Sequence, residues 1–160
     1  MDFIPDYYCM GINSREIINL DYKYDGMEMV NNSFVENIYM EENHLFLESG
    51  SKGGRDEIIF RDNNLNEKKM VVDIYDFDVS LMGSVIKVSE KKEIDIKGDN
   101  IGNVSCEVDN NNVAGCYIEN NKLYVVGKSK GSTEVKIFNS FKYKDKDYDC
   151  GVDKFMVVVV

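Results

Sequence analysis

The sequence contains no tryptophan, one proline (Pro5) and one histidine (His44) among its 160 residues. We find no grouping of nucleophile, base and oxyanion donors along it, so an enzyme is not expected. Long apolar runs are also missing. The longest, Phe155 to Val160, has six residues, whereas a helical membrane span needs about 20. No basic segment followed by an apolar one comes after Met1, so we expect neither a targeting segment nor membrane insertion within this sequence.

Basic residues are scarce relative to acidic ones, at 19 against 29, which gives a net charge of −10 at pH 7. Nucleic-acid binders use Lys and Arg to neutralise phosphates, so we exclude nucleic acid as a partner. Docking on an anionic membrane is disfavoured for the same reason. The hydrophobic content of 43% is sufficient for a packed core.

The chain repeats itself. Residues 34–60 align without gaps to residues 112–138, at an offset of 78. The first segment reads FVENIYMEENHLFLESGSKGGRDEIIF and the second NVAGCYIENNKLYVVGKSKGSTEVKIF, with ten of 27 positions identical. The identities end with Ile59/Ile137 and Phe60/Phe138. The sequence therefore predicts two copies of one module, which we place at residues 1–78 and 79–160.

Each copy has the pattern of short β-strands. In the second copy, polar and apolar residues alternate over residues 93–97, 104–108, 123–126 and 134–138. Asn-, Gly- and Asp-rich stretches, which suit tight turns, separate them. We predict an all-β chain of two tandem immunoglobulin-like β-sandwich domains. We also expect a short, stiff hinge at 76–84, and a charged and aromatic loop at 139–153.

The second copy, Val79 to Val160, resembles the bacterial immunoglobulin-like domain, group 2, the tandem module of intimin- and invasin-type surface proteins. The resemblance rests on the strand that follows Val88, on Val113-Ala114, and on the hairpin and glycine turn of residues 120–137. The first copy is similar only through the repeat. The family often has a tryptophan where this chain has Cys106. The resemblance implies an extracellular or cell-surface protein whose signal peptide lies outside this sequence.

The four cysteines form no C-x-x-C pair, which gives little support to a zinc site. Alternation places Cys106 and Cys116 on strand faces that point into the sandwich. A disulfide between them and two buried thiols remain open as alternatives. Cys150 lies in the predicted loop, where it could pair with either of them or stay exposed, and Cys9 has no counterpart in the repeat.

Three acidic and amide-rich clusters raise the question of calcium: Asp62–Glu67, Asp109–Asn112 and Asp145–Asp149. Calcium takes six to eight oxygen ligands, and none of these runs has EF-hand spacing. We interpret them as solvated turns and predict no metal site. If calcium does bind, we favour the loop at 145–153. Gly127-Lys128-Ser129 lacks the upstream glycine of a phosphate-binding loop, so no cofactor is predicted.

The function that this pattern favours is a structural or adhesion segment of a bacterial surface or secreted protein, without catalytic or cofactor-binding residues. It would act as a spacer or bind a protein or glycan on a cell surface. Two alternatives remain: a carbohydrate-binding accessory module of a secreted enzyme, and a surface decoration domain of a phage or virion. Tyr143 and Tyr148, beside lysines, are candidates for ligand contact or for loop packing.

Overall fold

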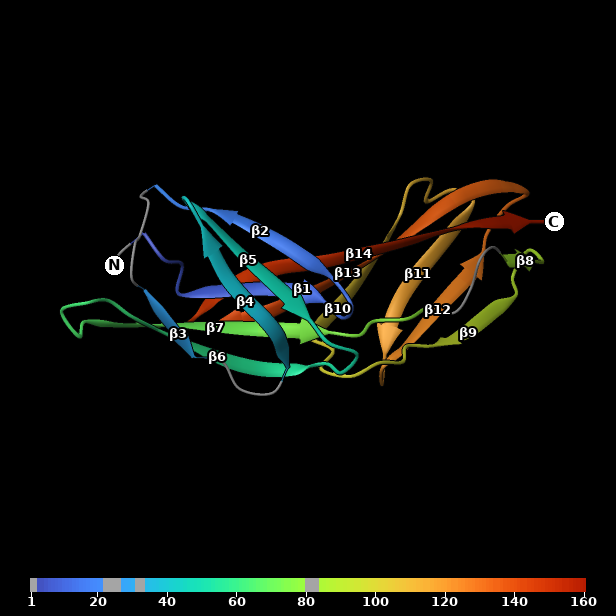
Figure 1. Cartoon of the computed structure of the whole chain (residues 1–160). Helices are drawn as coiled ribbons and strands as arrows, with labels where there is room; N and C mark the ends of the chain where they lie inside the picture. Colours follow the sequence, from blue (N-terminus) through green and yellow to red (C-terminus); the bar gives the residue numbers. More distant parts are fainter. Residues whose placement is uncertain (1–2, 22–26, 31–33, 80–83) are drawn as a thin grey trace. The chain divides into compact units, whose positions relative to one another are not determined.

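The computed structural model describes every residue except 1–2, 22–26, 31–33 and 80–83 (Figure 1). The described chain consists of strands joined by turns, and none of it forms a helix long and apolar enough to cross a membrane. It divides into two compact units, Met1–Asp76 and Phe77–Val160. Each unit contains one four-stranded and one three-stranded sheet. The prediction of an all-β chain with two sandwich domains is confirmed.

The first unit has seven strands, and its sheets follow the orders β1-β7-β6-β3 and β2-β5-β4. Their bounds are β1 Tyr7–Gly11, β2 Arg15–Asn19, β3 Glu28–Val30, β4 Val35–Glu41, β5 His44–Ser49, β6 Gly54–Arg61 and β7 Glu67–Tyr75. All neighbouring strands are antiparallel except β1 and β7, which are parallel.

The second unit repeats this arrangement strand for strand, with the sheets β8-β14-β13-β10 and β9-β12-β11. Its strands are β8 Ser84–Ile86, β9 Lys91–Asp95, β10 Asn103–Val108, β11 Ala114–Glu119, β12 Lys122–Gly127, β13 Gly131–Tyr143 and β14 Lys146–Val159. Its first and last strands, β8 and β14, are again parallel. The two-residue turn between β11 and β12 places Asn120 and Asn121 at positive φ, which asparagine tolerates better than most residues.

The core of each unit lies between its two sheets, where period-2 alternation turns every second side chain inward. In the first unit the packed core cluster consists of Ile4, Met10, Leu20, Val35, Leu45, Leu47, Ile58, Phe60, Met70, Val72 and Ile74. In the second unit the packed core cluster consists of Val79, Ile86, Ile94, Ile96, Val108, Val113, Ala114, Leu123, Val125, Val135, Ile137, Phe155, Val157 and Val159.

The structural repeat slips by one residue within the segment that aligned without gaps. Leu45 of β5 and Leu123 of β12 are both fully buried, as the offset of 78 requires. In the next strand, Phe60 of β6 is fully buried, whereas its aligned partner Phe138 is half-buried and Ile137 occupies the core. A shift of one residue moves a strand's side chains to the other face. The identities at the end of the alignment are therefore not structural equivalents.

The segment 139–153 is not a loop, so that expectation was wrong. β13 and β14 continue through it as an antiparallel hairpin, with a register irregularity at Asn139/Ser140. Lys144 and Asp145, both at positive φ, form the two-residue turn. The charged composition suggested a loop, but charged residues alternate with Phe141 and Tyr143, and that alternation is compatible with a paired ribbon.

The expected hinge lies partly outside the described residues. On its second-unit side, Asp78 forms an antiparallel bridge with Lys97, and their backbone hydrogen bonds measure 2.9 and 3.1 Å. Val79 is buried in the core of the second unit. The chain is therefore fixed to the second unit from Asp78 onward, up to the segment that is not described.

A buried carboxylate connects three strands of the first unit, with Tyr7 on β1, Arg55 on β6 and Asp73 on β7. Asp73 of β7 is 1% exposed, and its carboxylate accepts hydrogen bonds from the Tyr7 hydroxyl at 2.6 Å and from Arg55 Nη2 at 2.7 Å. Burial and the neighbouring Asp73 raise the pKa of Tyr7, so this phenol stays protonated and donating. The hydrogen bonds from Tyr7 and Arg55 compensate for the cost of burying the Asp73 carboxylate, which would be high without such partners.

We expect Asp73→Ala to lower the free energy of unfolding by about 3 kcal/mol, because it leaves the Tyr7 hydroxyl and Arg55 without their buried acceptor. Arg61→Ala is the control, since Arg61 pairs with Glu67 in an exposed salt bridge that contributes about 1 kcal/mol or less. Urea denaturation measures both. Equal losses in the two variants would contradict a structural role for the buried group.

Candidate functional site: facing thiols and stacked aromatic rings

The acidic clusters that raised the question of calcium use their oxygens within turns. Asp62 Oδ1 accepts the backbone N–H groups of Asn64 and Asn66, both at 2.9 Å, and Oδ2 accepts the Asn66 side-chain amide at 3.0 Å. The hydrogen bond from the Asn66 side chain is the main cause that lowers the pKa of Asp62. Asn110 Oδ1 similarly accepts the N–H of Asn112 at 3.0 Å.

The favoured calcium position, 145–153, was expected to be a loop and is instead the turn and first part of β14. Its aspartates at 145, 147 and 149 are separated by Lys146 and Tyr148, and the Lys146 ammonium lies 5.3 Å from the Tyr148 ring centroid. Over the described ranges, no three His, Cys, Asp or Glu side chains are grouped so that they could hold a metal ion.

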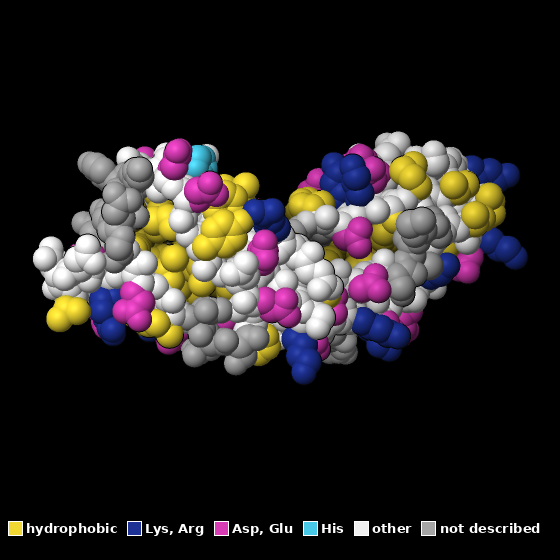
Figure 2. Space-filling model, in the orientation of Figure 1, with side chains coloured by type: hydrophobic (Ala, Val, Ile, Leu, Met, Phe, Trp, Pro, Cys, Tyr) yellow, Lys and Arg dark blue, Asp and Glu magenta, His cyan; other side chains and the backbone are white. Residues whose placement is uncertain are grey.

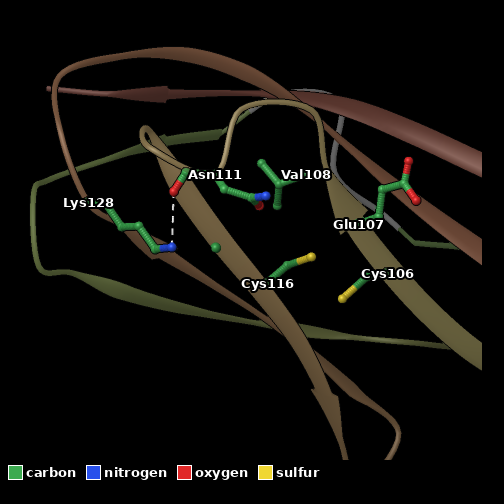
Figure 3. Close-up of a pocket in the computed structure, with 7 residues that line it drawn as sticks. Cys106, Glu107, Val108, Asn111, Cys116 and Lys128 are labelled. Atoms are coloured by element: carbon green, nitrogen blue, oxygen red, sulfur yellow. Dashed lines mark hydrogen bonds between the residues drawn. The ribbon is translucent and has the colours of Figure 1, made fainter.

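Two free thiols face each other in the second unit. Cys106 of β10 and Cys116 of β11 are half-buried, and their sulfur atoms point toward one another (Figure 3). Both pack against the core, as the alternation predicted. Of the two alternatives that the sequence left open for this pair, the structure therefore has two thiols and not a disulfide. Cys150 is 7% exposed, so it is not an exposed loop thiol, and it is paired with neither of these free cysteines.

The two sulfurs affect each other's ionisation. The hydrogen bond from Cys116 holds the pKa of the Cys106 thiol below its usual range, although burial opposes this. The same hydrogen bond, followed by burial, raises the pKa of Cys116. Cys106 is thus the member of the pair that ionises first, and the nucleophilic form of a cysteine is its thiolate.

The pair opens onto a hollow of about 450 Å³. The residues lining it are Cys106, Glu107, Val108, Asn111, Gly115, Cys116 and Lys128. At its rim, Lys128 Nζ donates a 3.0 Å hydrogen bond to the Asn111 carbonyl oxygen (Figure 3). In the first unit, a smaller hollow of about 170 Å³ is lined by Phe34, Glu36, Gly50, Ser51 and Lys52, and no cysteine lines it.

The outer face of the three-stranded sheet of the second unit carries a second feature. The rings of Tyr117 on β11 and Tyr124 on β12 stack with centroids 4.9 Å apart and an interplanar angle of 16°. The Lys91 ammonium on β9 lies 5.0 Å from the Tyr124 centroid and 5.9 Å from that of Tyr117. A hydrogen bond with Tyr117 is the main cause that raises the pKa of Lys91.

The first unit has the same cluster on the corresponding face. Tyr39 and Phe46 stack with centroids 4.6 Å apart and an interplanar angle of 6°. The Arg15 guanidinium lies 5.3 Å from the Phe46 centroid and donates a hydrogen bond to the Tyr39 hydroxyl. We call these two groups the cation–aromatic clusters: Arg15, Tyr39 and Phe46 in the first unit, and Lys91, Tyr117 and Tyr124 in the second.

Sequence reasoning missed both clusters, although part of the signal was present. Tyr39/Tyr117 was among the identities, and Phe46 aligns with Tyr124. The cations lie outside the aligned segment. Arg15 lies two residues before Ile17, which pairs with Phe46. In the same way, Lys91 lies two residues before Glu93, which pairs with Tyr124. An alignment extended to include β2 and β9 could have found these two cations.

His44 is the first residue of β5, and its ring centroid is 6.3 Å from that of Phe46. Tyr143 and Tyr148, predicted as candidates for contact or packing, are half-buried on opposite strands of the β13–β14 hairpin. Lys144 lies 5.4 Å from the Tyr143 centroid.

No protein-family model matches the sequence, and no curated protein matches it. Solved structures do share its fold. The C-terminal 282-residue fragment of intimin, in complex with the intimin-binding domain of its translocated receptor, is 13% identical with a TM-score of 0.53. That match covers 82% of this chain and 50% of the fragment, so the chain spans half the fragment's length.

Two further structures are similar at lower scores. Domains 4 and 5 of the S-layer protein SbsC are 17% identical with a TM-score of 0.44, over 71% of this chain and 69% of that one. The titin I-band fragment I67–I69 is 10% identical with a TM-score of 0.38, over 99% and 63%. At the identities observed, the likeness to intimin establishes an immunoglobulin-like fold and nothing more specific.

We expect Lys91→Met and Tyr124→Leu to be energetically coupled, with an interaction free energy of about 0.5–1 kcal/mol, because a cation over a ring that is still partly in contact with water contributes about that much. A double-mutant cycle measured by urea denaturation gives the coupling. Lys130→Met combined with Tyr124→Leu is the control, since Lys130 is an exposed turn residue. Coupling as large in the control as in the Lys91 cycle would contradict the cation–aromatic contact.

Proposed function

We propose that this chain is a non-catalytic segment of a bacterial surface or secreted protein, built of group 2-type bacterial immunoglobulin-like modules. The observation that carries the proposal is the strand-for-strand duplication: one seven-stranded sandwich occurs twice in succession, with the same sheet orders and the same parallel closing pair. A tandem of similar modules extends a chain by repetition, and that property suits a spacer or an adhesion segment.

The charge distribution is consistent with an exposed segment. The net charge of −10 favours solubility. Figure 2 shows one face of the molecule, on which acidic and basic side chains are interspersed. Neither the sign of the charge nor this mixture suits nucleic acid, so a protein or glycan at a cell surface is the partner class that we propose. The intimin fragment named above is itself in complex with a receptor domain.

The short connection between the units supports a spacer role. The chain re-enters a sheet pairing at Asp78 and the second core at Val79, soon after the first unit ends at Asp76. Few residues are therefore available as a flexible linker, and a short linker restricts the orientations that two modules can adopt. A stiff hinge remains part of the proposal.

The location is testable in cells that produce the protein. We expect an antibody raised against the chain to label intact cells, and added protease to remove the label, because a surface segment is accessible from outside. A cytosolic protein probed in parallel serves as the control for cell integrity. Labelling only after permeabilisation would overturn the proposal, and labelling of released virus particles in place of cells would support the virion alternative.

A glycan-binding role is the second candidate, and the cation–aromatic clusters favour it. Each presents stacked rings and a cation on the outer face of a three-stranded sheet, and Tyr117 is 38% exposed. Aromatic faces beside polar groups suit partners that are apolar on one side and hydrogen-bonding on the other. The pyranose rings of polysaccharides have this character.

We expect saturable binding to at least one polysaccharide of a glycan panel, and a loss of affinity of about tenfold or more when Phe46→Ala and Tyr124→Ala are combined. Each ring contact is worth about 1 kcal/mol, which makes the combined loss measurable. Lys130→Ala is the folded control. Isothermal titration measures the affinities, and unchanged binding in the double variant would contradict the clusters as the glycan site.

A further inference from the structure

We propose that Cys106 and Cys116 form a reversible dithiol–disulfide pair, which reacts with low-molecular-weight disulfides and closes a covalent link between β10 and β11. The inference is independent of the proposed function, because it rests only on the chemistry and placement of two side chains within the second unit.

The position of the pair gives the link a structural consequence. β10 is one of the two edge strands of the four-stranded sheet, and β11 is one of the two edge strands of the three-stranded sheet. The two sulfurs point toward each other across the gap between these edges (Figure 3). β10 and β11 belong to different sheets and are not paired in either, so a disulfide here would add a covalent link between the two sheets of the sandwich.

Equivalent positions in the first unit show that the fold does not require thiols there. Cys106 pairs with the core residue Ile137 as Met29 pairs with Phe60. Cys116 pairs with Val125, just as Ile38 pairs with Leu47 in the other unit. Met29 and Ile38 pack against the core of the first unit as apolar fillers. Two thiols in place of a methionine and an isoleucine add reactivity that core packing does not need.

A small disulfide can reach the pair from the hollow that the two cysteines line. Both thiols are half-buried and not sealed in the core. Lys128 brings a positive charge to the rim, within 3.0 Å of the Asn111 carbonyl oxygen. Glu107 lines the same hollow, so the lining carries one charge of each sign and does not favour small disulfides of one charge over the other.

The reaction is two thiol–disulfide exchanges. The Cys106 thiol gives its proton to solvent, its thiolate attacks one sulfur of the small disulfide RSSR, and the sulfur–sulfur bond of RSSR breaks to release RS⁻, which takes up a proton. The Cys116 thiolate then attacks the Cys106 sulfur of the mixed disulfide and releases the second RS⁻. The sum is two protein thiols plus RSSR giving one protein disulfide plus two RSH, so the protein is oxidised and RSSR is reduced.

The order of the two steps follows from the ionisation of the pair. The hydrogen bond from Cys116 lowers the pKa of Cys106, so Cys106 is the thiol that attacks first. Cys116 ionises less readily while its proton is donated to Cys106. Once Cys106 has formed the mixed disulfide, that thiolate acceptor is gone and Cys116 is adjacent to the bond that it must attack.

The test uses the whole 160-residue chain in mixtures of oxidised and reduced glutathione, quenched with acid and mapped by mass spectrometry without reduction. We expect a peptide that joins Cys106 to Cys116, lighter than the two free peptides by two hydrogen atoms and lost on reduction. We also expect the oxidised chain to melt about 5 °C or more above the reduced one, since the link constrains the unfolded chain.

Single variants separate the roles. Cys116→Ser should stop at a stable glutathione adduct on Cys106. Cys106→Ser should form its adduct on Cys116 at least tenfold more slowly at neutral pH. Cys106→Ala and Cys116→Ala replace them as tests of where the adduct forms if a serine variant fails to fold, as judged by circular dichroism. The comparison of rates uses the serine variants, because the hydroxyl of Cys116→Ser can still donate a hydrogen bond to Cys106. Glutathione adducts on both cysteines of the folded wild-type chain without a link, or no reaction at either, would overturn the proposal.

Discussion

In each unit, the antiparallel pairing of the sixth and seventh strands is the interaction on which the rest of the structure depends. β6 and β7, like β13 and β14, form the centre of a four-stranded sheet, and the other two strands of that sheet hydrogen-bond to this pair. The pair also supplies deeply buried side chains, among them Phe60, Met70 and Ile137. Its register therefore determines which residues enter the core and which strand edges remain open.

The sequence was sufficient to predict an all-β chain and, in the second copy, strands near residues 93–97, 104–108, 123–126 and 134–138, because these depend on local alternation and on glycine or asparagine at turns. It was not sufficient for register. Phe60 and Phe138 are aligned phenylalanines, but the segment before β6 is one residue longer than the segment before β13. Phe60 is therefore buried in the core, whereas Phe138 is half-buried. The β13–β14 hairpin was missed because paired strands and a charged loop can share one composition.

The candidate sites show the same division between local and non-local information. Alternation along β10 and β11 was enough to place Cys106 and Cys116 inward, as they are. Whether their sulfurs meet depends on how two different sheets pack, which no local pattern contains. The cation–aromatic clusters need three strands in register, and the cation of each comes from a strand outside the aligned repeat.

The matching strand order of the two units also bears on the dithiol pair that we propose for the second. Two copies of one sandwich share the same buried positions, so a pair of positions filled by Met29 and Ile38 in one copy tolerates Cys106 and Cys116 in the other. Half-burial matters here, because a fully enclosed thiol would pack without reacting and a fully exposed one would lack a fixed neighbour. An edge between two sheets meets both requirements, since it holds two strands face to face and leaves one side open to solvent.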